Sequence, residues 1–144
     1  FISRKTAPEE RDCVLVVDDN PFNLMTIASY SRELGVNVRT ALSGKACLAM
    51  LNKHMKGRGG KFFKLIFVDI LMPELDGFDL VEMLLKKMRD NEILEVPIIG
   101  LIGGTCEESK TKCLETGMCG YLRKPFEKEL LKNLYMENGI GMDI

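Results

Sequence analysis

Short apolar runs alternate with helix-like stretches five times along this chain, and that alternation limits its fold more than any other feature. The first run, CVLVV at residues 13–17, is continuously apolar, as is typical of a strand that is buried on both faces of a parallel sheet. Repeated strand–helix units imply a parallel sheet with helices on both of its faces. We therefore expect an α/β fold, a doubly wound five-stranded parallel sheet with five helices. The chain of 144 residues is long enough for one such domain.

The predicted boundaries follow from apolar runs and from capping residues. The strands are expected at residues 13–17, 37–41, 65–69, 96–102 and 120–122. The first helix should be capped by Asn20, begin at Pro21 and stop at Gly35, and Ser43 should cap the second. The organised domain is expected over residues 13–138. A polar linker at residues 1–12 precedes it, and a fraying C-terminal tail at residues 139–144 follows it.

Four charged side chains lie at the carboxyl ends of predicted strands or just after them. Asp18 and Asp19 come after the first strand, Asp69 ends the third, and Lys124 follows the fifth. Ligands of open α/β sheets bind beyond the carboxyl ends of the strands, so we expect these side chains to form one site. Two adjacent carboxylates about 4 Å apart repel by roughly 4 kcal/mol at an effective dielectric near 20. A bound divalent cation would offset that repulsion.

Three carboxylates and one amine suit phosphoryl transfer. Mg²⁺ takes oxygen ligands and is typically held by one or two carboxylates plus phosphate, and a lysine offers positive charge to a phosphoryl oxygen. A carboxylate can also act as the nucleophile and form an acyl phosphate. Asp69 stands alone at its strand end and is the predicted nucleophile, whereas Asp18 and Asp19 form the predicted metal pair. The set is sufficient to move a phosphoryl group onto an aspartate.

Composition disfavours several other classes of protein. The net charge of −1 creates no broad field for nucleic acid or an anionic membrane. The sequence contains no apolar run of about 18 residues, so no membrane span is predicted. The five cysteines form no CxxC, and one histidine cannot complete a Cys/His zinc set. An odd number of cysteines in a chain of this size favours a reducing compartment. The glycines of residues 57–61 match no phosphate-binding loop and indicate a connection.

Three separated motifs resemble a known family. VLVVDDN, VDILMPELDG and YLRKPF occur in the order typical of the receiver domains of two-component response regulators. The run DDNPFNLM is most similar to receivers attached to hybrid sensor histidine kinases, and the resemblance covers about residues 13–138. It implies a flavodoxin-like strand order of 2-1-3-4-5, Mg²⁺ as the cofactor, and a histidine kinase or histidine-containing phosphotransfer protein as the partner. It also implies a homodimer through the fourth helix and fifth strand, and no contact of this domain with nucleic acid or a membrane.

The resemblance assigns a role to each site residue. Asp69 matches the phosphoacceptor, Asp19 a direct Mg²⁺ ligand, and Asp18 an acidic partner that acts through water. The backbone carbonyl of Leu71 matches a further Mg²⁺ ligand. Lys124 precedes a proline whose peptide bond is often cis in this family, and it matches the lysine that pairs with the phosphoryl group.

The predicted switch departs from the family pattern at one position. Tyr121 matches the aromatic switch residue of the fifth strand. Receivers usually carry Thr or Ser at the end of the fourth strand, where this chain has Ile102. Isoleucine has no hydroxyl to donate, so we expect the conformational response to be weakened or rerouted, with Thr105 as an alternative donor. By family analogy, Leu71 and Gly104 offer no polar side chain to a hydrolytic water, which implies slow self-dephosphorylation.

The main hypothesis is a receiver that takes a phosphoryl group from a partner phosphohistidine. The alternative is a pseudo-receiver, an interaction module that works without phosphorylation. An aspartyl phosphatase is disfavoured because Asn20 and Leu71 occupy the positions two residues after Asp18 and Asp69, where such enzymes carry an acid. A flavin-binding protein is disfavoured because no early phosphate-cradling loop occurs. The domain is not expected to be a conventional enzyme by itself. The expected location is the cytoplasm, either as a stand-alone regulator or as the cytoplasmic part of a membrane-bound kinase.

Overall fold

The computed structural model describes residues 13–54, 63–72, 75–104 and 107–143, and these form ten alternating strands and helices. The strands are β1 (Cys13–Val17), β2 (Asn37–Ala41), β3 (Phe63–Asp69), β4 (Ile98–Ile102) and β5 (Gly120–Arg123). The helices are α1 (Pro21–Glu33), α2 (Gly44–His54), α3 (Gly77–Arg89), α4 (Glu107–Thr116) and α5 (Lys128–Glu137). All strand pairs are parallel, in the order β2-β1-β3-β4-β5. The predicted fold and strand order are confirmed.

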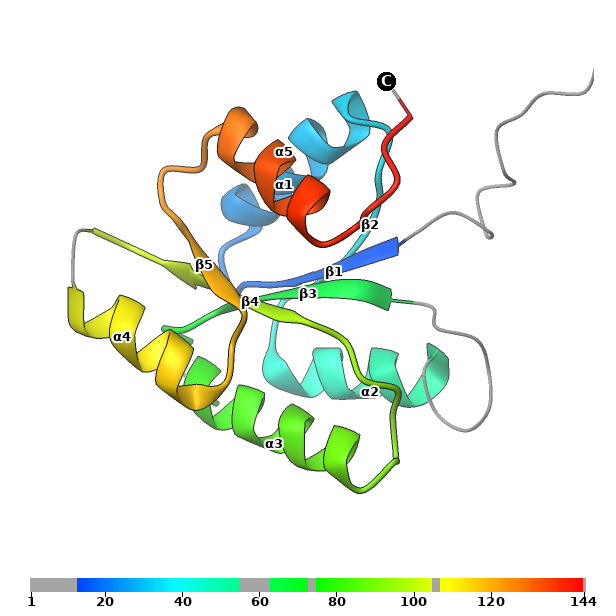
Figure 1. Ribbon diagram of the computed structural model, residues 1–144, viewed down its shortest axis with the longest axis vertical. Coiled ribbons are helices and arrows are strands. Elements are labelled where there is room, and N and C mark those ends of the chain that lie inside the picture. The colour runs from blue at the N-terminus through cyan, green and yellow to red at the C-terminus, as the bar shows by residue number, and fades with distance from the viewer. Residues whose placement is uncertain (1–12, 55–62, 73–74, 105–106, 144) are drawn as a thin grey trace, which may run out of the picture.

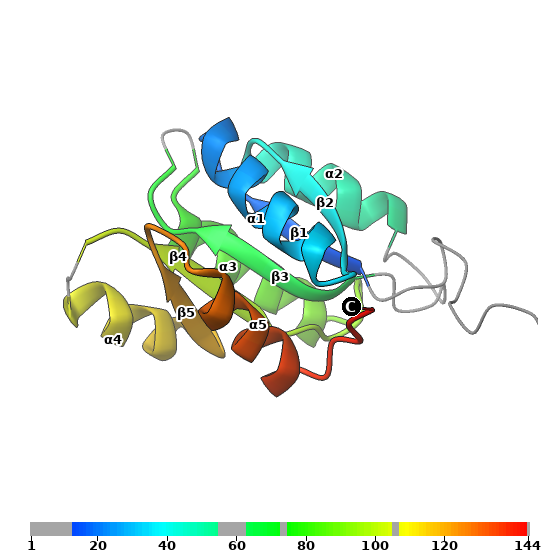
Figure 2. The same ribbon diagram turned by 90° about the horizontal axis from the view of Figure 1, so that it is seen from above.

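The helices form two layers around the sheet. α1 and α5 cover one face, and α2, α3 and α4 cover the other (Figure 1). Viewed from above, the strands run side by side beneath α1 and α5 (Figure 2). Successive side chains of a strand point to opposite faces, so Val14 and Val16 of β1 pack with α1 and α5, whereas Leu15 and Val17 pack with the other layer. The apolar run of β1 thus contributes to two separate cores.

Local signals start and stop the helices as predicted. The Asn20 side chain accepts a hydrogen bond from the backbone N–H of Phe22 at 2.9 Å, and Ser43 Oγ accepts one from Ala46 at 3.1 Å. Each cap satisfies a backbone donor that the first helical turn leaves unpaired. α1 ends just before Gly35, whose φ of +73° lies in the left-handed region that favours glycine.

The predicted fraying of the C-terminal tail is wrong up to residue 143. Ile140 is buried in the core beneath α1 and α5, and Met142 packs against that core. The backbone N–H of Asp143 donates to the carbonyl of Leu34 at 3.1 Å. A Cβ at Gly35 would overlap the backbone of Asp143, so the tail can pack here only because Gly35 has no side chain. Ile140 and Met142, the apolar residues beside the tail glycines, therefore contribute to the packing of the domain.

Three strand boundaries also differ from the prediction. β3 begins at Phe63, which is fully buried and pairs with Cys13, rather than at residue 65. β4 begins at Ile98 rather than at residue 96, and β5 ends at Arg123 rather than at residue 122. The linker at residues 1–12, the glycine run at 57–61 and Thr105 lie outside the described residues. Within the described part of the chain, no helix has the length and apolar character that a membrane span requires.

Candidate functional site

Strand register brings the predicted acids to one edge of the sheet. Val17 pairs with Val68, so Asp18 and Asp69 leave adjacent strands at the same level. One carboxylate oxygen from each of Asp18, Asp19 and Asp69 lies within 4.8 Å of the other two. The three acids that the sequence placed at strand ends therefore share one site, while their individual roles remain predictions.

Lys124 joins this cluster from β5. Its Nζ lies 3.2 Å from Oδ1 of Asp69 and 3.6 Å from Oδ2 of Asp18. The backbone N–H of Lys124 donates to the carbonyl of Ile102 at 2.7 Å, which extends the β4–β5 pairing to the edge of the site. The peptide bond between Lys124 and Pro125 is cis, as the family resemblance implies. The lysine thus bridges two buried carboxylates.

Asp18 is fully buried and is held by the start of α1. Its Oδ1 accepts from the backbone N–H of Asn20 at 2.9 Å, and its Oδ2 accepts from Nδ2 of Asn23 at 3.0 Å. Sequence reasoning missed Asn23. The available signal was its place in the first turn of the helix that follows the acidic pair, from which a side chain can reach back to the strand end. These two donors fix the orientation of the Asp18 carboxylate.

Asp69 combines burial with several charged neighbours. It is 2% exposed, and its Oδ1 accepts from the backbone N–H of Leu71 at 3.1 Å. Burial raises the pKa of Asp69 to about 6. The Leu71 hydrogen bond and the Lys124 ammonium act to lower that pKa, and the Asp18 charge acts to raise it. The carboxylate is therefore ionised near neutral pH and is held in a fixed orientation.

The donor set fits a divalent cation. Lys124 is the one cation that the described residues place in ion-pair contact with the three carboxylates. Two of those carboxylates, Asp18 and Asp69, are buried, so one lysine leaves an excess of negative charge in a poorly solvated place. A set of close carboxylate oxygens is what Mg²⁺ prefers. Asp19 is exposed and can present its carboxylate from the solvent side.

The other predicted site residues lie around this centre. Leu71 is 72% exposed, and its backbone N–H contacts Asp69. Ile102 is fully buried in the apolar cluster beneath the sheet. Tyr121 is 36% exposed, and Nζ of Lys110 lies 5.6 Å from the centroid of its ring. Of the two residues predicted to form the switch, Ile102 is therefore buried at the end of β4, next to the site, and Tyr121 lies at the surface.

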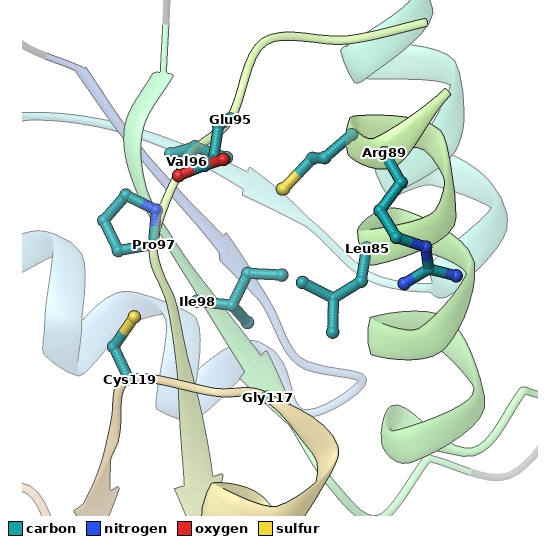
Figure 3. A pocket seen from close by; sticks show the side chains of 9 residues that line it. Leu85, Arg89, Glu95, Val96, Pro97, Ile98, Gly117 and Cys119 are labelled. Atoms are coloured by element: carbon teal, nitrogen blue, oxygen red, sulfur yellow. The ribbon is translucent and has the colours of Figure 1, made fainter. Parts of the chain in front are cut away.

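Two pockets differ in their relation to the site. A pocket of about 350 Å³ borders Asp19 and is lined mainly by apolar side chains such as Leu42, Leu48 and Met72. Another, of about 410 Å³, lies between α3 and the start of β4, where Leu85 and Ile98 line it (Figure 3). The second pocket is at the amino-terminal end of β4, away from the carboxyl ends that carry the acids. Of these two pockets, the first adjoins the candidate site.

Comparisons with known proteins place the chain in a family. The family model described as the response regulator receiver domain matches residues 14–135. The chain is 30% identical over 126 residues to hybrid signal transduction histidine kinase L of Dictyostelium discoideum. The matched region covers 88% of this chain but 7% of that protein. It is 31% identical to the crystal structure of the chemotaxis protein CheY4 of Vibrio cholerae, with a TM-score of 0.71 and coverage of 88% of this chain and 98% of that one.

A further structural likeness supports the fold alone. The receiver domain of the Saccharomyces cerevisiae response regulator Ssk1, solved with the histidine phosphotransfer protein Ypd1, has a TM-score of 0.77 at 24% identity, over 90% of this chain and 89% of that one. The curated relatives are much longer than this chain, which spans 7% of the kinase named above. Since the family model covers most of the sequence, the chain belongs to the family of response regulator receiver domains of two-component phosphorelay signalling.

Proposed function

We propose that this chain accepts a phosphoryl group from a phosphohistidine of a partner protein onto Asp69. The single observation that carries the proposal is the meeting of Asp18, Asp19, Asp69 and Lys124 at the carboxyl edge of the sheet. In the transfer, a P–O bond to Asp69 forms while the P–N bond of the phosphohistidine breaks, and the departing imidazole takes a proton from water. The product is an acyl phosphate.

Each residue of the site has a distinct task in this proposal. The Leu71 N–H and Lys124 hold Oδ1 of Asp69, so the carboxylate meets the phosphoryl group in a fixed orientation. Lys124 also neutralises charge on the phosphoryl oxygens. Asp18 and Asp19, with Asp69 and the backbone carbonyl of Leu71, would hold Mg²⁺. When bound, that ion supplies positive charge to the phosphoryl group.

The proposed partner is a histidine kinase or a histidine-containing phosphotransfer protein, and the proposed parent is a hybrid kinase. One finding supports this choice. The relative named above, 30% identical to this chain, is a hybrid histidine kinase. We also propose a cytoplasmic location. A homodimer through α4 and β5 remains a proposal that sedimentation with and without a phosphate mimic tests.

The substitution Asp69→Asn tests the central claim. It keeps the shape of the side chain but removes the nucleophile, so labelling by acetyl phosphate with Mg²⁺ should fall to background, as measured by intact-protein mass. The matched control is Asp79→Asn, which changes an exposed acid of α3 in the same way and should leave labelling unchanged. Full labelling of the Asp69→Asn protein would overturn the assignment.

The same assay separates the receiver from the pseudo-receiver. A pseudo-receiver would take no label even with an intact Asp69, whereas the proposed receiver takes one phosphoryl group.

We further propose that the acyl phosphate is long-lived, because Leu71 and Gly104 offer no polar side chain to an attacking water. Ile102, buried where the family carries a hydroxyl, is proposed to weaken or reroute the response at Tyr121. Decay of the label over time measures the first of these proposals.

A further inference from the structure

Helix α4 is held to the domain in an unusual way. Among its ten residues, all of which the structure describes, Cys113 alone is buried. Two lysines of α4 lie instead over aromatic rings of the neighbouring elements. Nζ of Lys112 is 4.4 Å from the ring centroid of Phe78 in α3, and Nζ of Lys110 is 5.6 Å from that of Tyr121 in β5. Both distances lie within the range of a cation–π contact.

The two contacts lie on different sides of the helix. Residues two positions apart on an α-helix do not face each other, so Lys112 reaches α3 while Lys110 reaches β5. Oε1 of Glu107 pairs with Nζ of Lys110 at 3.0 Å, and the Lys110 side chain is only 18% exposed. This ion pair keeps the ammonium group near the Tyr121 ring. α4 therefore links the first turn of α3 to the switch residue of β5.

The α3 end of this link touches the backbone of the phosphoacceptor. Gly77 directly precedes Phe78, and a Cβ at Gly77 would overlap the carbonyl oxygen of Asp69. The backbone N–H of Gly77 also donates to the carbonyl of Ile70 at 3.3 Å. Because these backbones are in contact, a shift of the Asp69 backbone would displace Gly77 and, with it, Phe78. Phe78 is itself buried, so its ring moves with the helix start.

Two glycines follow β4 on the way to α4. Among the described residues other than their chain neighbours, no atom lies within 4 Å of the position of an added Cβ at Gly103 or Gly104. Gly104 has a φ of +64°. Cys113 is the one buried side chain of α4, so apolar packing does little to fix this helix. The position of α4 therefore depends more on the two lysine contacts than it would in a helix with several buried apolar residues.

We propose that Lys112 and Lys110 are positioning residues that carry the state of Asp69 to Tyr121 through α4. This route runs from Asp69 through Phe78 and Lys112 to the helix, and from the helix through Lys110 to the ring. It needs no hydroxyl at Ile102. The inference rests on the proposed phosphoacceptor role of Asp69 and adds to it the means by which the surface responds.

Fluorine NMR of the 3-fluorotyrosine protein tests the route. The chain has three tyrosines, so three signals are expected, and the Tyr121→Phe variant identifies the one from Tyr121. Beryllofluoride with Mg²⁺ serves as the phosphate mimic, and its protein-bound fluorine signal reports occupancy of Asp69 in the same spectrum. The measured quantity is the displacement of the Tyr121 signal when the mimic binds.

Lys112→Met keeps the length of the side chain and removes its charge. We expect the bound mimic to persist while the Tyr121 displacement falls to half or less of its original size. Phe78→Leu should have the same effect, and the double variant should lose no more than either single variant, because both remove one contact. Lys110→Met should move the Tyr121 signal even without the mimic. The control is Lys86→Met, an exposed helical lysine of α3 paired with Asp90, and it should leave the displacement intact.

The outcomes separate this inference from the proposed function. Full displacement in both Lys112→Met and Phe78→Leu, or additive losses in the double variant, overturns the route. A bound mimic in the unmodified protein without any Tyr121 displacement also overturns it, while leaving the role of Asp69 intact. No bound mimic in the unmodified protein overturns both.

Discussion

The Asp69 carboxylate lies where burial disfavours its charge. Its pKa is raised from 3.8 to about 6, chiefly by burial and further by the Asp18 charge, against the lowering effect of Leu71 and Lys124. Because the folded protein binds this proton more tightly than the unfolded chain does, the contribution of Asp69 to stability is fully present below pH 3.8. That contribution is lost as the pH rises through about 6. The site therefore keeps its nucleophile ionised at some expense of stability.

Neutralising Asp69 should stabilise the metal-free protein. In the presence of a chelator at pH 7.5, we expect Asp69→Asn to raise the free energy of unfolding by about 1–3 kcal/mol, since one pKa unit is worth about 1.4 kcal/mol. The gain should shrink as the pH falls toward 4, where the aspartate is itself protonated. Urea unfolding at several pH values measures it. An equal gain at pH 4 and pH 7.5, or an equal gain from the control Asp79→Asn, would contradict this account.

Ile102 allows a direct test of the missing hydroxyl. Ile102→Thr adds a donor near the end of β4, and Ile102→Val gives a side chain of the same shape without it. Valine should cost about 0.5–1.5 kcal/mol of stability, and threonine about 1–3 kcal/mol more because its hydroxyl is buried without the phosphoryl partner. With beryllofluoride bound, only the threonine variant should enlarge the fluorine-NMR displacement of Tyr121. Equal displacements of the Tyr121 signal in the two variants would show that the missing hydroxyl at position 102 does not limit the response of Tyr121.

At the scale of elements, the existence of each strand was more predictable than its first residue. β1 and β2 have the predicted bounds, and the apolar run of β3 ends at Asp69 as predicted. The start of β3 was missed because Lys64 interrupts its apolar pattern, although the buried Phe63 before it belongs to the strand. The lysine–aromatic contacts of α4 left no trace in the sequence, because Phe78 and Lys112 meet only after two helices pack on one sheet face.

The C-terminal tail was misread for a related reason. Its glycines suggested fraying, yet the burial of Ile140 depends on Gly35, a residue of a distant turn. No local pattern connects the two. The site itself was more predictable than the tail, because its acids and its lysine sit at strand ends, and a parallel sheet brings all such ends to the same edge.

Gly35→Ala should release the tail. Alanine at a φ of +73° costs about 1–2 kcal/mol, and its Cβ would also overlap the Asp143 backbone, so we expect a total loss above about 2 kcal/mol. The matched control is Gly139→Ala. Gly139 has a φ of +69°, and among the described residues other than its chain neighbours no atom lies within 4 Å of the added Cβ. The control should lose the conformational part alone. Thermal unfolding and hydrogen exchange at the Ile140 amide measure both effects, and equal losses in the two variants would argue against the overlap.

For the whole molecule, the site exists only when the sheet is complete. Asp18 and Asp19 follow β1, Asp69 ends β3 and Lys124 follows β5, so no single strand–helix unit carries a usable set of groups. Lys124 is the one cation that the described part of the chain pairs with the two buried carboxylates, so local negative charge is left that the fold must hold in place. A ligand that neutralises this charge binds the folded chain and not the unfolded one. Such binding stabilises the entire domain.

Mg²⁺ should therefore raise the unfolding free energy of the whole domain in a dose-dependent way. At ten times its dissociation constant the expected gain is about 1.4 kcal/mol, measured as a shift of the thermal midpoint against NaCl of equal ionic strength. Asp19→Asn removes the exposed member of the triad without disturbing the hydrogen bonds of Asp18, so it should weaken the Mg²⁺ effect while changing stability little in chelator. An unchanged Mg²⁺ effect in that variant would place the ion elsewhere, because the three carboxylates are expected to act on one cation.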